Sequence, residues 1–196
     1  MEKPHHEHFM KEAIKQAVIA LEKGEVPVGA VVVWKQRIIA RAYNQMEMLH
    51  DPTAHAEMIA LTQASETLSQ LPEASPNSFQ SQRSGDWGSP CRHSGKERKE
   101  KGQPAGGKEH RGSLEGATLY VTLEPCPMCA GALVMTKCTN LVYGARDAKG
   151  GACHSLFRIT EDDRLNHRVK VTGGLMADDS KFLLSEFFKN LRKEKR

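Results

Sequence analysis

The sequence predicts an α/β fold in which helices pack in layers against a sheet of buried strands. Short runs of β-branched, apolar residues, typical of strands buried on both faces, alternate with longer segments whose apolar residues recur every three or four positions, typical of helices. The chain has 196 residues, which is enough for one compact domain with a substantial core. Such alternation within one domain is typical of layered α/β proteins.

The first part of the chain contains two expected helices and two expected strands. A helix is expected over about 8–23, where apolar residues share one face. The run Val-Gly-Ala-Val-Val-Val-Trp at 28–34 predicts a buried strand, and a second strand is expected at 37–43. The next helix is expected to start at Asp51–Thr53, which offers capping residues and an early proline, and to continue to about Leu68.

The composition changes between about residues 71 and 113. This stretch is rich in Ser, Gly, Pro, Gln, Lys and Arg, and Phe79 and Trp87 are nearly its only large apolar residues. Such a segment buries too little apolar surface to offset the entropy lost on ordering. We therefore expect a single domain over 1–196, interrupted by a disordered insertion at about 71–113.

The remaining elements follow the insertion. A strand is expected at 117–123, a helix over about 127–136 and a further strand at 141–145. A short fifth strand is expected at 169–171, and an amphipathic helix over 178–192. That helix is expected to bury four large side chains: Phe182, Leu183, Phe187 and Leu191.

The net charge and the first residues of the chain limit the kinds of partner that the protein is expected to have. There are 28 basic and 24 acidic residues, a formal net charge of +4, which permits a nucleic-acid partner without requiring one. The chain start lacks the apolar segment of a signal peptide, and no apolar run has the length of a membrane span. These features predict a cytoplasmic protein with no membrane partner. In a reducing compartment, a C-x-x-C motif is expected to bind metal or to act in redox chemistry.

Two short motifs carry the chemistry. The tripeptide His-Ala-Glu stands at 55–57, and Pro-Cys-Pro-Met-Cys stands at 125–129. One histidine and two thiolates supply three zinc ligands, and a three-ligand site that leaves the fourth position for water is typical of catalytic zinc. The expected ligands are His55, Cys126 and Cys129. With Glu57 they form the H-x-E … P-C-x-x-C signature of zinc-dependent nucleobase deaminases.

Both motifs are expected at helix starts. Residues three apart are neighbours there, so C-x-x-C places both sulfurs on one side. The unpaired N–H groups and the helix dipole favour thiolates. Zinc held there lowers the pKa of a bound water towards neutrality. Glu57 is expected to take the proton of that water and to return it to the ring nitrogen and the leaving ammonia of the base.

On the residues alone, other interpretations stay open. A C-x-x-C motif also fits a redox dithiol or a structural zinc site, and a structural site needs a fourth ligand. Four residues are candidates for that ligand: Cys91, Cys138, Cys153 and His154. Cys91 lies in the expected insertion, and Cys138 is expected to be a small buried residue. Cys153 and His154 remain possible fourth ligands. A histidine tract is expected to be solvated rather than metal-binding: His5, His6 and His8.

The resemblance to a known family extends well beyond these motifs. Six segments resemble the bacterial tRNA-specific adenosine deaminases: Glu25–Val31, Asp51–Glu57, Thr118–Cys126, Gly144–Lys149, Asn166–Val169 and Leu184–Phe188. The resemblance implies a cytidine-deaminase-like fold, a three-layer α/β/α sandwich around a central, mostly five-stranded mixed sheet. It also implies a homodimer, one zinc ion per chain, and conversion of the wobble adenosine of a tRNA anticodon to inosine.

The same resemblance implies three substrate contacts. Asn44 falls where the family places an asparagine that hydrogen-bonds the flipped base, Asp147 where a loop aspartate contacts the nucleotide's sugar or backbone, and Phe188 on a helix near the anticodon stem-loop. Without the resemblance, the residues themselves favour a turn position for Asn44, a loop position for Asp147 and a core position for Phe188. The chain departs from the family pattern at its insertion and at Cys153–His154, where the family carries small residues.

Two other functions are compatible with the zinc motif. One is deamination of a free nucleobase or nucleoside of the cytidine or guanine type on the same fold, and the other is a non-catalytic zinc-stabilised RNA-binding module. The family segments and a basic terminal helix favour tRNA over a free base. The basic residues of that helix are Lys189, Arg192, Lys193 and Lys195. The intact Glu57 favours an enzyme over a binding module.

Overall fold

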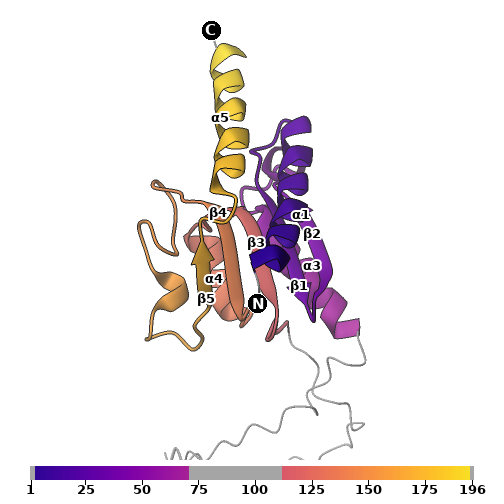
Figure 1. Ribbon diagram of the computed structural model, residues 1–196, viewed down its shortest axis with the longest axis vertical. Coiled ribbons are helices and arrows are strands. Elements are labelled where there is room, and N and C mark those ends of the chain that lie inside the picture. Colours follow the sequence, from indigo (N-terminus) through magenta and orange to yellow (C-terminus); the bar gives the residue numbers. More distant parts are fainter. Residues whose placement is uncertain (1–2, 71–111, 195–196) are drawn as a thin grey trace, which may run out of the picture.

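The computed structural model describes residues 3–70 and 112–194, which form a five-stranded sheet with helices on both faces (Figure 1). The strands are β1 (Gly29–Trp34), β2 (Arg37–Tyr43), β3 (Thr118–Leu123), β4 (Asn140–Ala145) and β5 (Lys170–Gly173). Their order is β2-β1-β3-β4-β5. The strand β1 pairs antiparallel with β2 and β3, whereas β3, β4 and β5 run parallel. The expected mixed five-stranded sheet is therefore confirmed.

The helices connect and cover these strands. They are α1 (Lys3–Glu22), α2 (Met46–Leu49), α3 (Ala56–Gln70), α4 (Pro127–Met135) and α5 (Ala177–Glu194), and a 3-10 turn lies at Ile159–Glu161. The expected helices are all present, whereas the one-turn α2 was not expected. None of the described helices combines the length and the apolar character needed to cross a bilayer.

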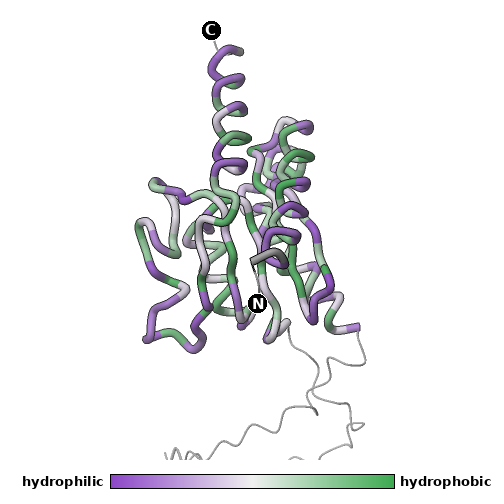
Figure 2. The backbone as a smooth tube through the Cα atoms, viewed as in Figure 1, coloured by the Kyte–Doolittle hydropathy of each residue, from purple (hydrophilic) through white to green (hydrophobic). Residues whose placement is uncertain are grey.

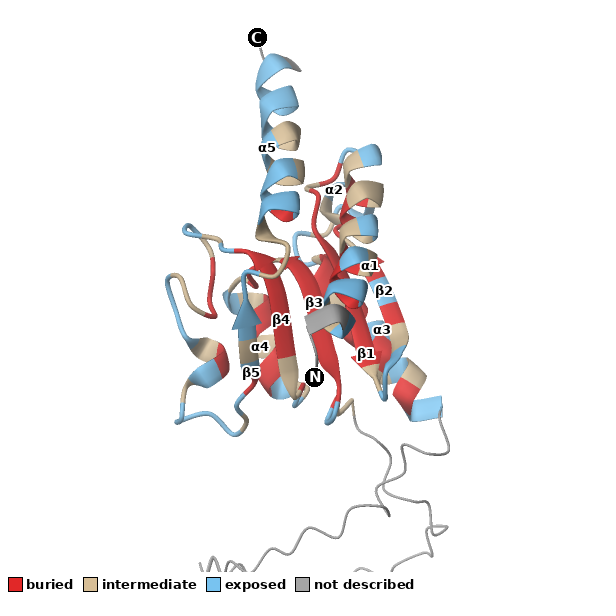
Figure 3. Cartoon of the chain, viewed as in Figure 1, coloured by how far each residue is buried: buried red, intermediate tan, exposed pale blue. Residues whose placement is uncertain are grey.

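Alternating residues of the central strands fill two separate cores. Val31 of β1 packs with α1 and with Tyr120 of β3, whereas the next residue, Val32, packs on the opposite face with α3 and α4. Side chains of successive strand residues point to opposite faces, so strands that are apolar throughout are buried between two helix layers. The central strands are indeed buried along most of their length (Figure 3). The expected three-layer α/β/α sandwich is confirmed.

The start expected at Asp51–Thr53 for the helix that is α3 in the structure is wrong by several residues. Asp51 does not cap a helix, because its Oδ1 accepts hydrogen bonds from the backbone N–H and the hydroxyl of Thr53 and closes a local turn. The helix α3 begins only at Ala56, and the carbonyl of His55 accepts the N–H of Ile59. This later start places His55 at the helix N-terminus itself.

The expected burial of the terminal helix is also wrong. Phe182 is 63% exposed and Leu191 is 36% exposed, while Leu183 and Phe187 are half-buried. Only the start of α5 packs on the domain, where Ser180 is buried, and the rest projects away with apolar positions along it (Figure 2). An amphipathic pattern shows that a helix has an apolar face, but it does not show what covers that face.

The polar segment expected at about 71–113 lies outside the described residues, apart from Gly112 and Ser113. The described chain resumes with Leu114, which is fully buried. Its N–H donates to the carbonyl of Thr136, at the end of α4. Packing therefore begins three residues before the strand predicted at 117–123.

Candidate metal centre

Two helix N-termini on the same face of the sheet carry the expected zinc ligands. His55 immediately precedes α3, Cys126 is the N-cap of α4, and Cys129 lies in the first turn of α4. The proline after Cys126 suits the first helical position, because the missing N–H would have no intrahelical partner there. Both helices pack on the sheet through the same core cluster, which brings their N-termini together.

The three donor atoms have the separations that one tetrahedral zinc ion requires. Sγ of Cys126 lies 3.6 Å from Sγ of Cys129, and His55 Nδ1 lies 3.7 Å and 3.5 Å from the two sulfurs. Zinc bonds of about 2.3 Å to sulfur and about 2.0 Å to nitrogen at tetrahedral angles give about 3.8 Å between sulfurs and about 3.5 Å between sulfur and nitrogen. The donor set therefore fits zinc.

The charge state of the two thiols also suits a cation. The pKa of Cys126 falls to about 4, mainly because of its side-chain hydrogen bond with Cys129. The pKa of Cys129 is raised well above its usual range by this same contact and by burial. Two thiolates at such a short distance repel each other, and a divalent cation between them removes that repulsion. His55 is half-buried, and its pKa is raised mainly by the contact with Cys126.

Glu57 lies beside this triad without belonging to it. It occupies the first turn of α3 and is only 4% exposed. Burial raises the pKa of its carboxyl group, because the charged form loses water. A buried carboxyl next to three metal ligands, but outside the donor cluster, has the position that a proton-transferring group needs.

The structure narrows the alternatives for a fourth protein ligand. Among the described residues, only His55, Cys126 and Cys129 gather their donor atoms within 4.8 Å of one another. Cys138 is buried after the far end of α4, with Sγ 3.4 Å from the carbonyl oxygen of Asn140. Cys153 is also buried apart from the triad. The ring Nδ1 of His154 lies 2.8 Å from the hydroxyl of Tyr143, and this histidine also stays outside the donor cluster. The fourth candidate, Cys91, lies outside the described residues.

The three residues expected to contact substrate lie on different elements. Asn44 follows β2 and is 4% exposed. The N–H of the next residue donates to the carbonyl of Ala54, which holds this segment against the residue that precedes His55. Asp147 is half-buried in the loop after β4, and Phe188 is 43% exposed on the projecting α5. Their substrate contacts stay predictions.

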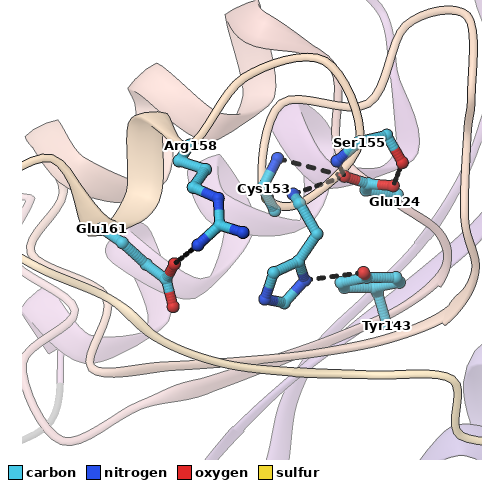
Figure 4. Close-up of polar contacts among 7 residues, drawn as sticks. Glu124, Tyr143, Cys153, Ser155, Arg158 and Glu161 are labelled. Atoms are coloured by element: carbon cyan, nitrogen blue, oxygen red, sulfur yellow. Dashed lines mark hydrogen bonds and ion pairs between the residues drawn. The ribbon is translucent and has the colours of Figure 1, made fainter.

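Sequence reasoning missed two buried carboxylates. Glu25 is 1% exposed and Glu124 is 2% exposed. Glu124 follows β3 and accepts hydrogen bonds from the loop after β4, as Figure 4 shows. The available signal was an acidic residue directly adjoining a run of buried apolar residues, because a charge rarely enters a core unless donors satisfy it.

Comparison with known proteins agrees with this centre. The model of the cytidine and deoxycytidylate deaminase zinc-binding region matches residues 3–145, and that of MafB19-like deaminases matches 103–192. A tRNA-specific adenosine deaminase of Bacillus subtilis is 40% identical over 190 residues, which are 97% of this chain and 92% of the relative. One from Aquifex aeolicus is 39% identical over 95% of each chain. The chain belongs to the tRNA-specific adenosine deaminase family.

A solved structure confirms the fold of this deaminase. The structure comes from a study of A-to-I editing by tRNA:A34 deaminases at the wobble position, and it matches with a TM-score of 0.67 and 35% identity. The match covers 90% of this chain and 99% of the other. The expected family, fold class and zinc-dependent hydrolase class are therefore confirmed.

Proposed function

We propose that this chain converts the wobble adenosine of a tRNA anticodon to inosine by zinc-dependent hydrolysis, releasing ammonia. The observation that carries the proposal is the triangle of His55, Cys126 and Cys129 donors with Glu57 buried beside it. The names of the relatives, which match almost the whole chain, support tRNA adenosine as the substrate.

The residues of the centre divide the work. His55, Cys126 and Cys129 hold the zinc, which supplies the Lewis acidity that makes water nucleophilic at neutral pH. The Glu57 carboxylate accepts a proton from the attacking water. It passes this proton to the ring nitrogen. It then accepts the remaining proton of the added hydroxyl and passes it to the exocyclic amine, so the C–N bond breaks, a carbonyl forms and the nitrogen leaves as ammonia. The surrounding core excludes bulk water from Glu57, which is 4% exposed.

Three residues are proposed to bind the nucleotide. Asn44 hydrogen-bonds the base, Asp147 contacts the sugar or backbone, and Phe188 contacts the anticodon loop. A base within a helical stack does not reach a buried metal, whereas an unpaired anticodon base is splayed out at low cost. The exposed basic residues of α5 suit the phosphates of such a loop: Lys189, Arg192 and Lys193.

The assembly and the domain organisation are part of the proposal. We propose a cytoplasmic homodimer, and exposed apolar side chains such as Met135 (85%) and Phe157 (53%) support a surface covered by a second copy. Light scattering of the purified protein tests the dimer.

We also propose one domain with a tolerated insertion, because closure entropy changes slowly with loop length. Replacing residues 71–113 by a short Gly/Ser connection should leave zinc content and deamination intact.

The test of the reaction is direct. The purified zinc protein is incubated with an anticodon stem-loop that carries adenosine at the wobble position, and the digested RNA is analysed for inosine. Free adenosine, cytidine and guanine are tested in parallel. Inosine in the stem-loop alone supports the proposal. Turnover of a free base alone identifies a small-molecule deaminase, and binding without turnover of any substrate identifies an RNA-binding module.

A further inference from the structure

The carboxylate of Glu124 is saturated with hydrogen-bond donors from a distant loop (Figure 4). Its Oε1 accepts the backbone N–H groups of Cys153 (3.2 Å), His154 (2.7 Å) and Ser155 (2.8 Å). Its Oε2 accepts the N–H of Asp147 at 3.1 Å and the hydroxyl of Ser155. One side chain that is 2% exposed thus satisfies four backbone donors, which are buried or partly buried.

This carboxylate connects two parts of the proposed site. Glu124 stands two residues before the metal ligand Cys126, and its donors extend from Asp147 to Ser155. Main-chain bonds reinforce the connection, because the N–H of Ala152 donates to the carbonyl of Pro125 at 2.8 Å. The loop after β4 is therefore fastened to the segment that presents Cys126.

The contact is also tightly packed. A Cβ added at Gly151 would lie 2.4 Å from Cδ of Glu124 and 2.6 Å from its Oε2, well inside van der Waals contact. The loop backbone therefore lies directly against the carboxylate, with no space for a larger side chain at Gly151. A shift of the carboxylate must move the loop, because well-packed groups transmit displacements to their neighbours.

A second anchor holds the far side of the loop. The ring Nδ1 of His154 lies 2.8 Å from the hydroxyl of Tyr143, whose ring is buried in β4. This contact involves neither Glu124 nor the metal ligands. A change confined to Glu124 is therefore expected to alter the position of Asp147 without unfolding the loop.

We propose that Glu124 is a positioning residue of the deaminase. Its carboxylate fixes the loop that presents Asp147 relative to the segment that presents Cys126, so the nucleotide end and the metal end of the site keep a constant separation. The proposal rests on the proposed function in one respect, which is that Asp147 contacts the nucleotide.

The geometry predicts what an amide does at this position. Glutamine offers one acceptor oxygen, which in Glu124→Gln best faces the three N–H groups of residues 153–155. Its amide nitrogen then faces the hydroxyl of Ser155, which accepts, and the N–H of Asp147, which does not. Glu124→Gln therefore removes the bond to Asp147 and retains the others.

The experiment compares Glu124→Gln with Ser155→Ala, which removes a donor to the same carboxylate but leaves the Asp147 bond. Zinc content, melting, kcat and KM for the wobble-adenosine stem-loop are measured for both. For Glu124→Gln we expect full zinc, cooperative melting, and a KM raised about tenfold with a nearly unchanged kcat. Ser155→Ala should keep both constants close to wild type. Equal effects of the two variants, or loss of zinc in Glu124→Gln, would overturn the proposal.

Two further measurements distinguish a failure of the role proposed for Glu124 from a failure of the proposed function. In an Asp147→Ala background, Glu124→Gln should add little to KM, because its effect acts through Asp147; additive effects would contradict the proposal. Hydrogen exchange followed by NMR needs no activity. The Asp147 amide should lose protection in Glu124→Gln while the amides of 153–155 keep theirs. Inactive wild-type protein with this exchange pattern would refute the proposed function and retain the positioning role, whereas an unchanged Asp147 amide would refute the role.

Discussion

The side-chain amide of Asn44 donates a 3.2 Å hydrogen bond to Oε2 of Glu25, and both side chains are almost completely buried. The other carboxylate oxygen accepts the N–H of Met48 at 2.8 Å. A carboxylate only accepts, so it must face the amide nitrogen and not the amide oxygen of Asn44. Glu25 thereby fixes the orientation of the residue proposed to hydrogen-bond the base.

An exchange of these two groups tests the pair. Asn44→Asp places a second carboxylate against Glu25 and should lower the free energy of unfolding by about 1–3 kcal/mol, because a buried acceptor loses its donor. Adding Glu25→Gln restores a donor and should recover much of that loss. Denaturant unfolding of the zinc-loaded variants measures both effects. Deamination should stay low in the double variant, because the base meets an acid in place of the amide. Full recovery of activity would contradict a base contact by Asn44.

Zinc binding should depend on the triad and not on cysteine in general. Cys129→Ala is expected to lose most of the bound zinc, because two ligands hold the metal far more weakly than three. Cys138→Ala is the matched control, since Cys138 is also fully buried but lies outside the donor cluster. It should lose some stability and keep about one zinc per chain. Metal analysis after dialysis decides the question, and equal zinc in both variants would refute the ligand assignment.

The position of each metal ligand at a helix start was predictable because it depends on nearby residues. The C-x-x-C spacing and the following helical pattern determine where Cys126 and Cys129 lie on α4. The tripeptide at 55–57 likewise stands at the start of α3, although the local turn at Asp51 delays that start. The strands were predictable because their residues are apolar on both faces. These features depend on neighbouring residues, which the sequence displays directly.

The partners of the buried carboxylates and the exposure of α5 were not predictable, because they depend on residues far away in the sequence. Glu124 is satisfied by backbone N–H groups 23 to 31 residues away, and any residue type supplies such a donor. No pattern of side chains marks that partnership. The burial of Phe182 depends on which surface lies opposite α5, and its periodicity carries no information on that surface.

Glu57 should be required for turnover and dispensable for metal and RNA binding. Glu57→Gln keeps the size of the side chain but removes its ability to carry protons, and we expect kcat to fall by at least about a hundredfold. Zinc content and stem-loop affinity should stay close to wild type, because Glu57 is not a member of the triad. Glu66→Gln, on the exposed face of the same helix, is the control. Loss of zinc from Glu57→Gln would assign Glu57 to the metal instead.

Stem-loop affinity should fall steeply with salt through the basic end of α5. Each phosphate contact to a single-stranded region adds about 0.7 to the slope of log affinity against log salt. Replacing Lys189, Arg192 and Lys193 together by alanine should therefore reduce the slope by up to about 2, with kcat at saturating RNA unchanged. A matched alanine variant of the exposed Lys11 and Lys15 on α1 should keep the slope. Fluorescence anisotropy at several salt concentrations measures both, and a flat wild-type slope would favour a free base as substrate.

The packing of α1 on the sheet should weaken in mild acid. His6 Nδ1 lies 2.8 Å from the hydroxyl of the buried Tyr120, and burial lowers the pKa of His6 from its ordinary value of 6.5. The unfolded chain therefore binds a proton more readily than the folded protein. The stability from neutral His6 is complete above about pH 6.5 and decreases as the pH falls below that value.

Comparison with His6→Gln isolates this effect, because glutamine pairs with the tyrosine hydroxyl but does not titrate. Melting temperatures are measured between pH 7.5 and pH 5.5, and the change is expected below about pH 6.5. As the pH falls, the melting temperature of the wild type should decrease more than that of His6→Gln. Tyr120→Phe removes the hydrogen bond but keeps the ring. If burial of His6 causes the loss of stability in acid, that loss should persist in the Tyr120→Phe variant. Parallel pH dependence of wild type and His6→Gln would show that His6 does not sense acid in the folded protein.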